Sequence, residues 1–332
     1  ADQDKIRLRI ARISLVIGSL LLIFKFYAYE ITDSQAILSD ALESIVNVLG
    51  AVIALITISI ASKPADKDHP YGHGKAEYFS VAFEGGFISF AAALIFYEAV
   101  RNLVSKNQIQ NIEIGIYFTV FAGLVNGALG FYLKRAGKKL KSLALKGSGD
   151  HLISDFITSI GLAVGLVVVI FTKAYWIDSV IAIILGFFLA KTGFGLVKKS
   201  LAGLMDAEDL GVIKKIGKVF AKKIFPGIIR IHYTRVIRSG RYHHIDAHIV
   251  VPEFWDVTRA HNEVSRFEKL VFEEYPNDGE LHFHLDPCRK AYCEVCDLAD
   301  CPIRQKPFVQ RLSFTLEELT DPQEPEEFRK EK

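Results

Sequence analysis

The fold is decided by residues 39–61, SDALESIVNVLGAVIALITISIA, a run that is apolar enough to cross a membrane but carries side chains able to bind a metal. Glu43 and Asn47 lie four residues apart, about one helical turn, so they share one face of a helix. A second apolar run, GDHLISDFITSIGLAVGLVVVIF, has the same spacing between His151 and Asp155. Such groups are costly in lipid unless they face a partner, an ion or water. We therefore expect a transported cation here, with polar contacts between helices as the alternative.

Apolar runs divide the chain into a membrane part and a soluble part. Hydrophobic residues make up 50% of the 332 residues and the mean hydropathy is +0.24, which is high for a soluble protein. The first run fits a membrane span better than a cleavable signal peptide. Basic residues cluster before the first span and after every second one, so we expect both termini in the cytoplasm. Six transmembrane helices are predicted, near residues 10–29, 36–62, 79–104, 112–133, 147–172 and 175–200.

The soluble part shows shorter periodicities. They predict a helix, a hairpin of two strands, a second helix and a last strand, in the order αββαβ. This order is typical of a small α+β domain of the ferredoxin-like kind, with helices on one face of a sheet. Strand alternation places His248, His284 and Asp286 together on the opposite face. The predicted boundaries are 1–204 for the membrane domain, 205–287 for the soluble domain, 288–310 for a cysteine-containing extension and 311–332 for an acidic, mobile tail.

Several motifs resemble the cation diffusion facilitator family. The resemblance is carried by Asp40, by the two spaced pairs, by DHPYGHGK at 68–75 and by HLDP at 284–287. Members of this family are six-helix metal/proton antiporters with a C-terminal cytoplasmic metallochaperone-like domain, and the resemblance covers residues from about 10 to about 290. It implies a transport site at Glu43, Asn47, His151 and Asp155. Asp40 and Asp150 either support these ligands or are solvated near helix ends.

The resemblance also implies metal sites outside the transport site, and a homodimer. The loop site is Asp66, His69 and His73, and the cytoplasmic site is His232, His248, His261, His284 and Asp286. Lys75 and Asp206 match residues that form a charge interlock between protomers, or else they are two unrelated interfacial charges. The other histidines of the soluble domain, His243, His244 and His282, are expected to be solvated, with a role as further ligands as the alternative.

The transport ligands depart from the pattern of many family members, which have His or Asp followed by Asp in the second span. With Glu43 and Asn47 in these places the set is rich in oxygen, and its two carboxylates balance a divalent ion. Zinc, iron(II), manganese(II) and cobalt(II) all remain candidates for the transported ion. Zinc is the ion expected at the cytoplasmic sites.

All four cysteines lie just beyond the soluble domain. They are spaced C-x4-C-x2-C-x4-C, so four thiols fall within fourteen residues and can surround one tetrahedral ion. A reducing cytoplasm disfavours disulfides, which favours a structural zinc site. A regulatory role, or a share of the neighbouring His/Asp site for Cys288, is the alternative. The four residues are Cys288, Cys293, Cys296 and Cys301.

These observations predict a secondary transporter that exports a divalent transition metal in exchange for protons. The formal net charge of +2 gives no reason to expect nucleic acid as a partner. No H-E-x-x-H motif is present, so an intramembrane metalloprotease is not expected. A metal sensor or a metal-conducting channel is the alternative, although a tight multidentate site suits alternating access better than conduction. The expected location is the cell membrane, most simply a bacterial inner membrane, with multiple spans.

Overall fold

The computed structural model describes residues 2–32, 35–105, 112–172 and 176–323. The chain divides into two compact units, Ala1–Met205 and Asp206–Lys332, each with its own hydrophobic core.

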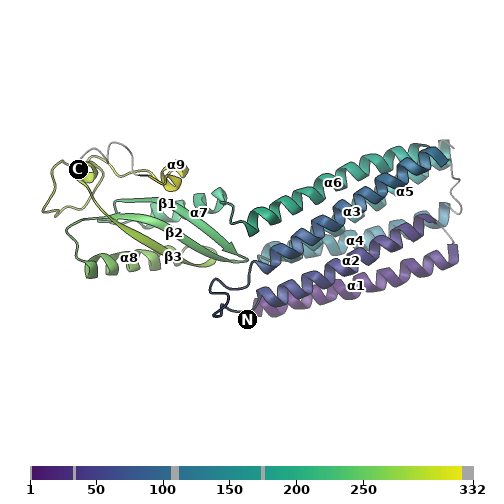
Figure 1. Cartoon of the computed structure of the whole chain (residues 1–332), viewed down its shortest axis with the longest axis horizontal. Helices are drawn as coiled ribbons and strands as arrows, with labels where there is room; N and C mark the ends of the chain where they lie inside the picture. Colours follow the sequence, from purple (N-terminus) through teal and green to yellow (C-terminus); the bar gives the residue numbers. More distant parts are fainter. Residues whose placement is uncertain (1, 33–34, 106–111, 173–175, 324–332) are drawn as a thin grey trace. The chain divides into compact units, whose positions relative to one another are not determined.

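The first unit consists of long helices that run side by side (Figure 1). Their bounds are α1 Asp2–Thr32, α2 Gln35–Ala61, α3 Ala76–Ser105, α4 Ile112–Lys139, α5 Leu143–Thr172 and α6 Trp176–Leu204. Among the described residues, α1 to α5 are each long and apolar enough to cross a membrane. Helix α6 has 29 residues, and residues 179–197 within it contain a single charged side chain, Lys191. The predicted architecture of membrane helices followed by a small α+β domain is confirmed.

Small residues let the helices approach closely. At Gly85 of α3, an added Cβ would lie only 2.7 Å from the backbone oxygen of Gly193 in α6. At Gly149 of α5, an added Cβ would lie 2.5 Å from the backbone nitrogen of Lys134 in α4. Close packing of this kind replaces the hydrophobic effect as the force between helices in lipid.

A buried ion pair fixes one end of the helical unit. Arg7 of α1 donates to Glu77 of α3 across 3.2 Å and also to the backbone oxygen of Leu140. The second oxygen of Glu77 accepts from Ser142 Oγ at 2.7 Å and from the backbone of Ala144 at 3.0 Å. Because both charges are buried and multiply bonded, they tie α1, α3 and the start of α5 together.

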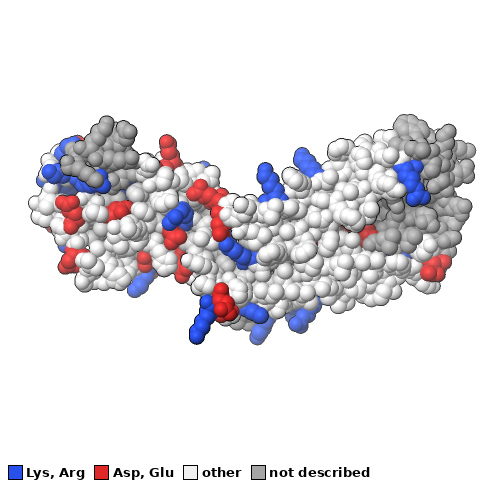
Figure 2. All heavy atoms as spheres, viewed as in Figure 1, with Lys and Arg blue, Asp and Glu red and all other residues white. Residues whose placement is uncertain are grey.

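Charged side chains are unevenly distributed over the helical unit. On the face shown in Figure 2, Lys and Arg gather toward the end that holds the start of α1, and the middle of the bundle is almost free of charge. This distribution suits helices whose middle lies in lipid.

The second unit has the predicted αββαβ order. Helix α7 spans Leu210–Lys223, β1 Arg230–Ser239, β2 Tyr242–Val251, α8 Val257–Phe272 and β3 Asp278–Pro287. The Asp209 and Asp256 side chains cap the starts of the two helices by accepting backbone hydrogen bonds. The strands lie in the order β1-β2-β3, with β1 antiparallel and β3 parallel to β2. Ile245, Ala247 and Ile249 face the core under the helices, as alternation predicts.

Beyond β3 the chain does not form the free tail that its acidic composition predicts. A 3₁₀ turn, Lys290–Glu294, is followed by a short helix, α9 Leu316–Thr320. Leu319 is 1% exposed and packs on Gly217 of α7. The tail prediction was therefore wrong for residues 312–323, because apolar side chains spaced through this acidic segment find a place in the core. Residues 324–332 lie outside the described part of the chain.

The same C-terminal segment supports an irregularity in β1. The pairing of β1 with β2 shifts between His232 and Arg235, and Tyr233 has a positive φ of 45°. This backbone conformation is strained for a residue with a side chain. The Tyr233 backbone nitrogen donates to the Asp321 backbone oxygen at 3.0 Å, and the buried Arg230 guanidinium contacts both Glu318 and Asp321. Contacts from the C-terminal segment therefore stabilise the bulge next to His232.

Candidate transport site and metal centres

Three of the four predicted transport ligands meet between α2 and α5. Asn47 lies on α2, and His151 and Asp155 lie one turn apart on α5. Asn47 Nδ2 donates to Asp155 Oδ2 over 2.7 Å, and His151 Nε2 lies 2.5 Å from Asn47 Oδ1. His151 Nε2 is also 3.5 Å from Asp155 Oδ2. Both His151 and Asp155 are buried, so this polar group is held within the apolar part of the bundle.

The hydrogen bonds determine where the hydrogen atoms of this group lie. A carboxylate can only accept, so Asn47 turns its Nδ2 toward Asp155 and its Oδ1 toward His151. Because Asn47 Oδ1 also only accepts, His151 Nε2 carries the hydrogen of the 2.5 Å contact. A ring nitrogen that holds a hydrogen has no lone pair for a metal. A hydrogen and a metal ion therefore cannot occupy His151 Nε2 at the same time.

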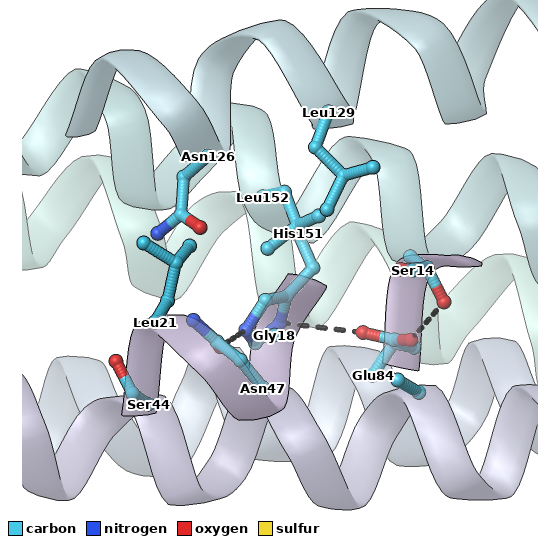
Figure 3. A pocket seen from close by; sticks show the side chains of 12 residues that line it. Ser14, Gly18, Leu21, Ser44, Asn47, Glu84, Asn126, Leu129, His151 and Leu152 are labelled. Atoms are coloured by element: carbon cyan, nitrogen blue, oxygen red, sulfur yellow. Dashed lines mark hydrogen bonds and ion pairs between the residues drawn. The ribbon is translucent and has the colours of Figure 1, made fainter. Parts of the chain in front are cut away.

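Glu84 of α3 is a further carboxylate at this site, and it is not among the residues predicted from the sequence. Its Oε2 lies 3.3 Å from His151 Nδ1, and its Oε1 accepts from Ser148 Oγ at 2.5 Å. Glu84 is 2% exposed, and Gly50 of α2 leaves room for it, since a Cβ there would lie 3.3 Å from Oε1. Figure 3 shows His151 between Asn47 and Glu84. A carboxylate within an apolar span was the signal that could have revealed Glu84.

A pocket opens beside these residues, with walls from five helices (Figure 3). Its polar lining includes residues other than the predicted ligands. The apolar part of the lining includes Leu21, Leu129 and Leu152. Polar groups in such a place can supply further oxygen ligands or hold water. The polar lining residues are Ser14, Ser44, Asn47, Asn126, Ser148, His151 and Glu84.

The other residues predicted for the transport site lie differently. Glu43 is half-buried one turn before Asn47, and its charge acts on His151. Asp150 instead pairs with Lys134 Nζ of α4 at 2.7 Å, which places its charge on a different side of α5. The side chain of Asp40 lies outside the described residues.

The loop between α2 and α3 brings its three predicted ligands together. One ligand atom each from Asp66, His69 and His73 lie within 4.8 Å of one another. Asp66 Oδ1 is 3.2 Å from His69 Nδ1, and Asp66 Oδ2 is 3.4 Å from His73 Nε2. Backbone hydrogen bonding from His69 lowers the pKa of the Asp66 carboxyl below its usual value, which keeps this exposed group ionised.

A second group of candidate ligand atoms lies on the face of the sheet opposite the two helices. His248 Nδ1 is 2.9 Å and His232 Nε2 is 3.8 Å from Asp286 Oδ2, while His284 Nε2 is 3.5 Å from the other oxygen. Both ring nitrogens of His232 are buried without a hydrogen-bond partner. Burial, reinforced by the charge of Arg230, lowers the pKa of His232 to about 4. A neutral imidazole with an unsatisfied nitrogen beside a carboxylate suits a metal such as zinc.

The remaining histidines only partly follow the prediction. His261 is exposed on α8, where its charge acts on Glu268, and it is not part of the group formed by His232, His248 and Asp286. His243 and His244 are buried, which corrects the expectation that they are solvated: His243 Nδ1 lies 2.6 Å from the Tyr275 hydroxyl, and His244 Nδ1 lies 2.6 Å from Glu280. His282 is 67% exposed, as expected.

The four cysteines line one pocket next to the end of β3. All are free thiols, and Cys296 is buried while the others are half-buried. Burial raises the pKa of the Cys288 thiol to about 11 and also raises the pKa of Cys296. Within the described residues, no three of these sulfurs lie as close together as the ligand atoms of the loop and sheet groups do.

Comparison with known proteins identifies the family. Residues 11–205 match the cation efflux transmembrane domain, and residues 210–288 match the cytoplasmic domain of cation efflux proteins. The chain belongs to the cation efflux family. It is thus a multi-pass membrane transporter of cations, a cation diffusion facilitator with a C-terminal cytoplasmic domain, and not an enzyme.

Several curated relatives of this cation efflux protein align over most of its length. An uncharacterised transporter of Synechocystis sp. is 37% identical over 264 residues, covering 79% of this chain and 84% of the relative. The manganese efflux system protein MneS of Bacillus subtilis is 29% identical over 255 residues, covering 76% and 86%. The cation-efflux pump FieF of Salmonella newport is 26% identical over 287 residues, covering 84% and 92%.

Proposed function

We propose that this cation efflux protein exports a divalent transition metal in exchange for protons, and that the exchange takes place at His151. The observation that carries the proposal is the 2.5 Å contact between His151 Nε2 and Asn47 Oδ1. This contact requires a hydrogen on the nitrogen that faces Asn47 and Asp155. Metal binding at Nε2 must expel that hydrogen, and its return must weaken the hold on the metal.

Each neighbouring residue has a part in this exchange. When His151 loses the hydrogen from Nε2, the Asn47 amide loses its donor, and both the nitrogen and Asn47 Oδ1 become available to the cation. Asp155 then gives up the hydrogen bond that it accepts from Asn47 and contacts the metal ion instead. Glu84 Oε2 lies 3.3 Å from His151 Nδ1, close enough to orient the ring, and a ring oriented in this way is a stronger ligand through Nε2. Glu43 supplies the second carboxylate of the predicted ligand set.

We propose manganese(II) as the preferred ion among manganese(II), iron(II), cobalt(II) and zinc. Carboxylates and amide oxygens outnumber the single imidazole at this site, and such ligands suit manganese better than softer ions. The printed name of the Bacillus subtilis relative states manganese efflux, which agrees with this choice.

The same proposal places the protein in a bacterial inner membrane as a homodimer with both termini in the cytoplasm. The Lys and Arg side chains toward the end of the bundle that holds the start of α1 support this orientation (Figure 2). In the cytoplasmic domain, His232, His248 and Asp286 would hold zinc through two imidazoles and a carboxylate, with His284 beside them. A bound zinc ion would link β1, β2 and β3. It would also give His232, whose ring nitrogens have no hydrogen-bond partner, a bond to one of them.

Metal-resolved uptake into vesicles that contain the purified protein tests the function. Uptake of manganese(II), iron(II), cobalt(II), zinc and cadmium is measured with and without a pH gradient. We expect uptake of manganese(II) to be fastest and to accelerate when the vesicle interior is acidic, because outgoing protons exchange for incoming metal. Uptake that ignores the pH gradient for every metal would refute antiport, and a preference for zinc or cadmium would refute the choice of manganese(II).

A further inference from the structure

The cysteine extension holds a site that the family match does not cover. The match to the cytoplasmic domain ends at residue 288, whereas the pocket lined by the four cysteines is formed mainly by residues beyond it. We propose that this pocket binds one zinc ion through the sulfurs of Cys288, Cys293, Cys296 and Cys301. The ion would hold residues 288–311 against the edge of the sheet.

The extension has little regular structure and only a small apolar core. Its regular structure before α9 is a single 3₁₀ turn, Lys290–Glu294. Its apolar contacts with the sheet are small and involve Tyr292 and Cys296 packed on Ile229 and Val250. Segments with so small a core are usually stabilised by disulfides or a structural metal. All four cysteines are free thiols, so no disulfide supplies this stabilisation and their sulfurs are available to a metal.

The surroundings of the sulfurs suit thiolates bound to a metal. The backbone nitrogen of Glu253 donates to Cys288 Sγ at 3.4 Å, and the backbone nitrogen of Gln305 donates to Cys293 Sγ at 3.5 Å. Such donors orient ligand sulfurs and stabilise their negative charge. The two donors come from different loops, Glu253 from the loop after β2 and Gln305 from the loop beyond the last cysteine. Both loops therefore contribute hydrogen bonds to the cysteine sulfurs.

The charge around the pocket and the hydrogen bonds of Arg304 also support zinc binding by the four cysteines. Four thiolates around one zinc ion leave a net charge of about −2. Arg289, Lys290 and Arg304 line the pocket, against a single acidic residue, Glu253. The Arg304 guanidinium also donates to the backbone oxygens of Cys293 and Cys296, each at 3.0 Å, and of Leu298 at 2.6 Å. It therefore fixes the turn that carries the two central cysteines while adding positive charge beside them.

Binding requires the sulfurs to move closer together. A tetrahedral zinc site places its sulfurs about 3.8 Å apart, and no three of the described cysteine sulfurs lie within 4.8 Å of one another. Cys288, Cys293 and Cys301 are only half-buried, so their side chains can rotate into the pocket they already line.

Cobalt(II) and zinc binding by the full-length protein, purified in detergent under reducing conditions, test the proposal. We expect wild-type protein to retain about one more zinc ion per chain than a variant with all four cysteines changed to serine. Cobalt(II) should give a sulfur-to-metal charge-transfer band and the visible bands of a tetrahedral centre. His232→Ala is the matched control, because it removes a ligand of the sheet group and should leave the charge-transfer band intact.

Equal zinc counts in wild type and variant, without a charge-transfer band in wild type, would overturn the proposal. Iron accompanied by acid-labile sulfide would also overturn it, because the cysteines would then hold a cluster rather than a single ion. If the fourfold variant fails to fold, Cys301→Ser should still weaken zinc retention and alter the cobalt spectrum. A chelator should speed proteolysis within residues 288–311 of wild-type protein. None of these measurements depends on transport, so the site can fail while the proposed function stands.

Discussion

At the scale of single residues, the central feature is the chain of contacts that runs from Asp155 through Asn47 to His151 and on to Glu84. Asn47 decides its chemistry, because an amide donates on one side and accepts on the other, and so forces the hydrogen onto His151 Nε2. A carboxylate in place of Asn47 could not bridge Asp155 and His151 in this way. The amide therefore makes the bonding pattern specific while keeping the charge of the site low.

Replacing Glu84 by Gln should weaken metal binding at the transport site. The change removes the carboxylate 3.3 Å from His151 Nδ1, so the ring becomes a poorer ligand. We expect the apparent affinity for manganese(II) in vesicle uptake to fall roughly 10- to 100-fold. Ser148→Ala, which removes only the hydroxyl bonded to the other oxygen of Glu84, should have a smaller effect. Unchanged affinity in Glu84→Gln would remove this residue from the site.

The low pKa of His232 should make the soluble unit less stable in acid. Burial and the charge of Arg230 lower its pKa from 6.5 to about 4 in the folded chain. The unfolded chain therefore binds a proton that the folded chain does not, so the stabilisation is complete above pH 6.5. It is lost as the pH falls toward 4, by about 3 kcal/mol in total.

Hydrogen exchange of the β1 and β2 amides measures this effect, in the presence of a chelator and after correction for intrinsic rates. Protection in wild type should drop between pH 7.5 and pH 5, and His232→Asn should remove much of that drop. His282→Asn changes an exposed imidazole and serves as the control. If His232→Asn kept the full pH dependence, another group would be responsible.

At the scale of helices and strands, packing between helices depends on a few small residues. The α3–α6 contact is close enough that a Cβ on Gly85 would meet the Gly193 backbone oxygen at 2.7 Å. Backbone atoms cannot rotate away as a side chain can, so the helices themselves must separate. Such strain typically costs about 1–3 kcal/mol.

Gly85→Ala should therefore lower the thermal stability of the protein in detergent, measured by the loss of monodisperse protein on heating. The neighbouring Gly86 is the matched control, because a Cβ there would have no atom within 4 Å. Gly86→Ala should leave stability unchanged or raise it, since alanine favours helix by about 1 kcal/mol over glycine. Equal stability of the two variants would mean that α3 and α6 are not packed this closely.

The sequence predicted the helices and strands well because a membrane and a half-buried sheet each impose a simple period on apolar residues. The sequence did not predict burial that depends on contacts between distant parts of the chain. The burial of Leu319 depends on the space at Gly217, which no local pattern reveals. His243 is buried because the Tyr275 hydroxyl lies opposite it. The spacing of ligands within one helix does not reveal Glu84, because its partner, His151, comes from a helix far along the chain.

At the scale of the whole molecule, the chain joins a cation efflux transmembrane domain to a cytoplasmic domain, and the family resemblance predicts that two copies associate. The predicted interlock between Lys75 and Asp206 offers a test of that association. Lys75→Asp should shift the protein toward monomers in detergent, measured by light scattering, because like charges would meet across the interface. Adding Asp206→Lys should restore the dimer. Failure of the double variant to recover would argue that the two residues do not pair between protomers.

The most direct test of the account is the simultaneous measurement of metal and proton flux in vesicles that contain the purified protein. Internal pH and manganese(II) uptake are recorded together for wild type and for His151→Ala. Wild type should release protons from the vesicle interior in proportion to the metal taken up, and His151→Ala should lose this coupled flux. Metal-driven proton movement that persists undiminished in His151→Ala would contradict the claim that the two cations compete for His151 Nε2.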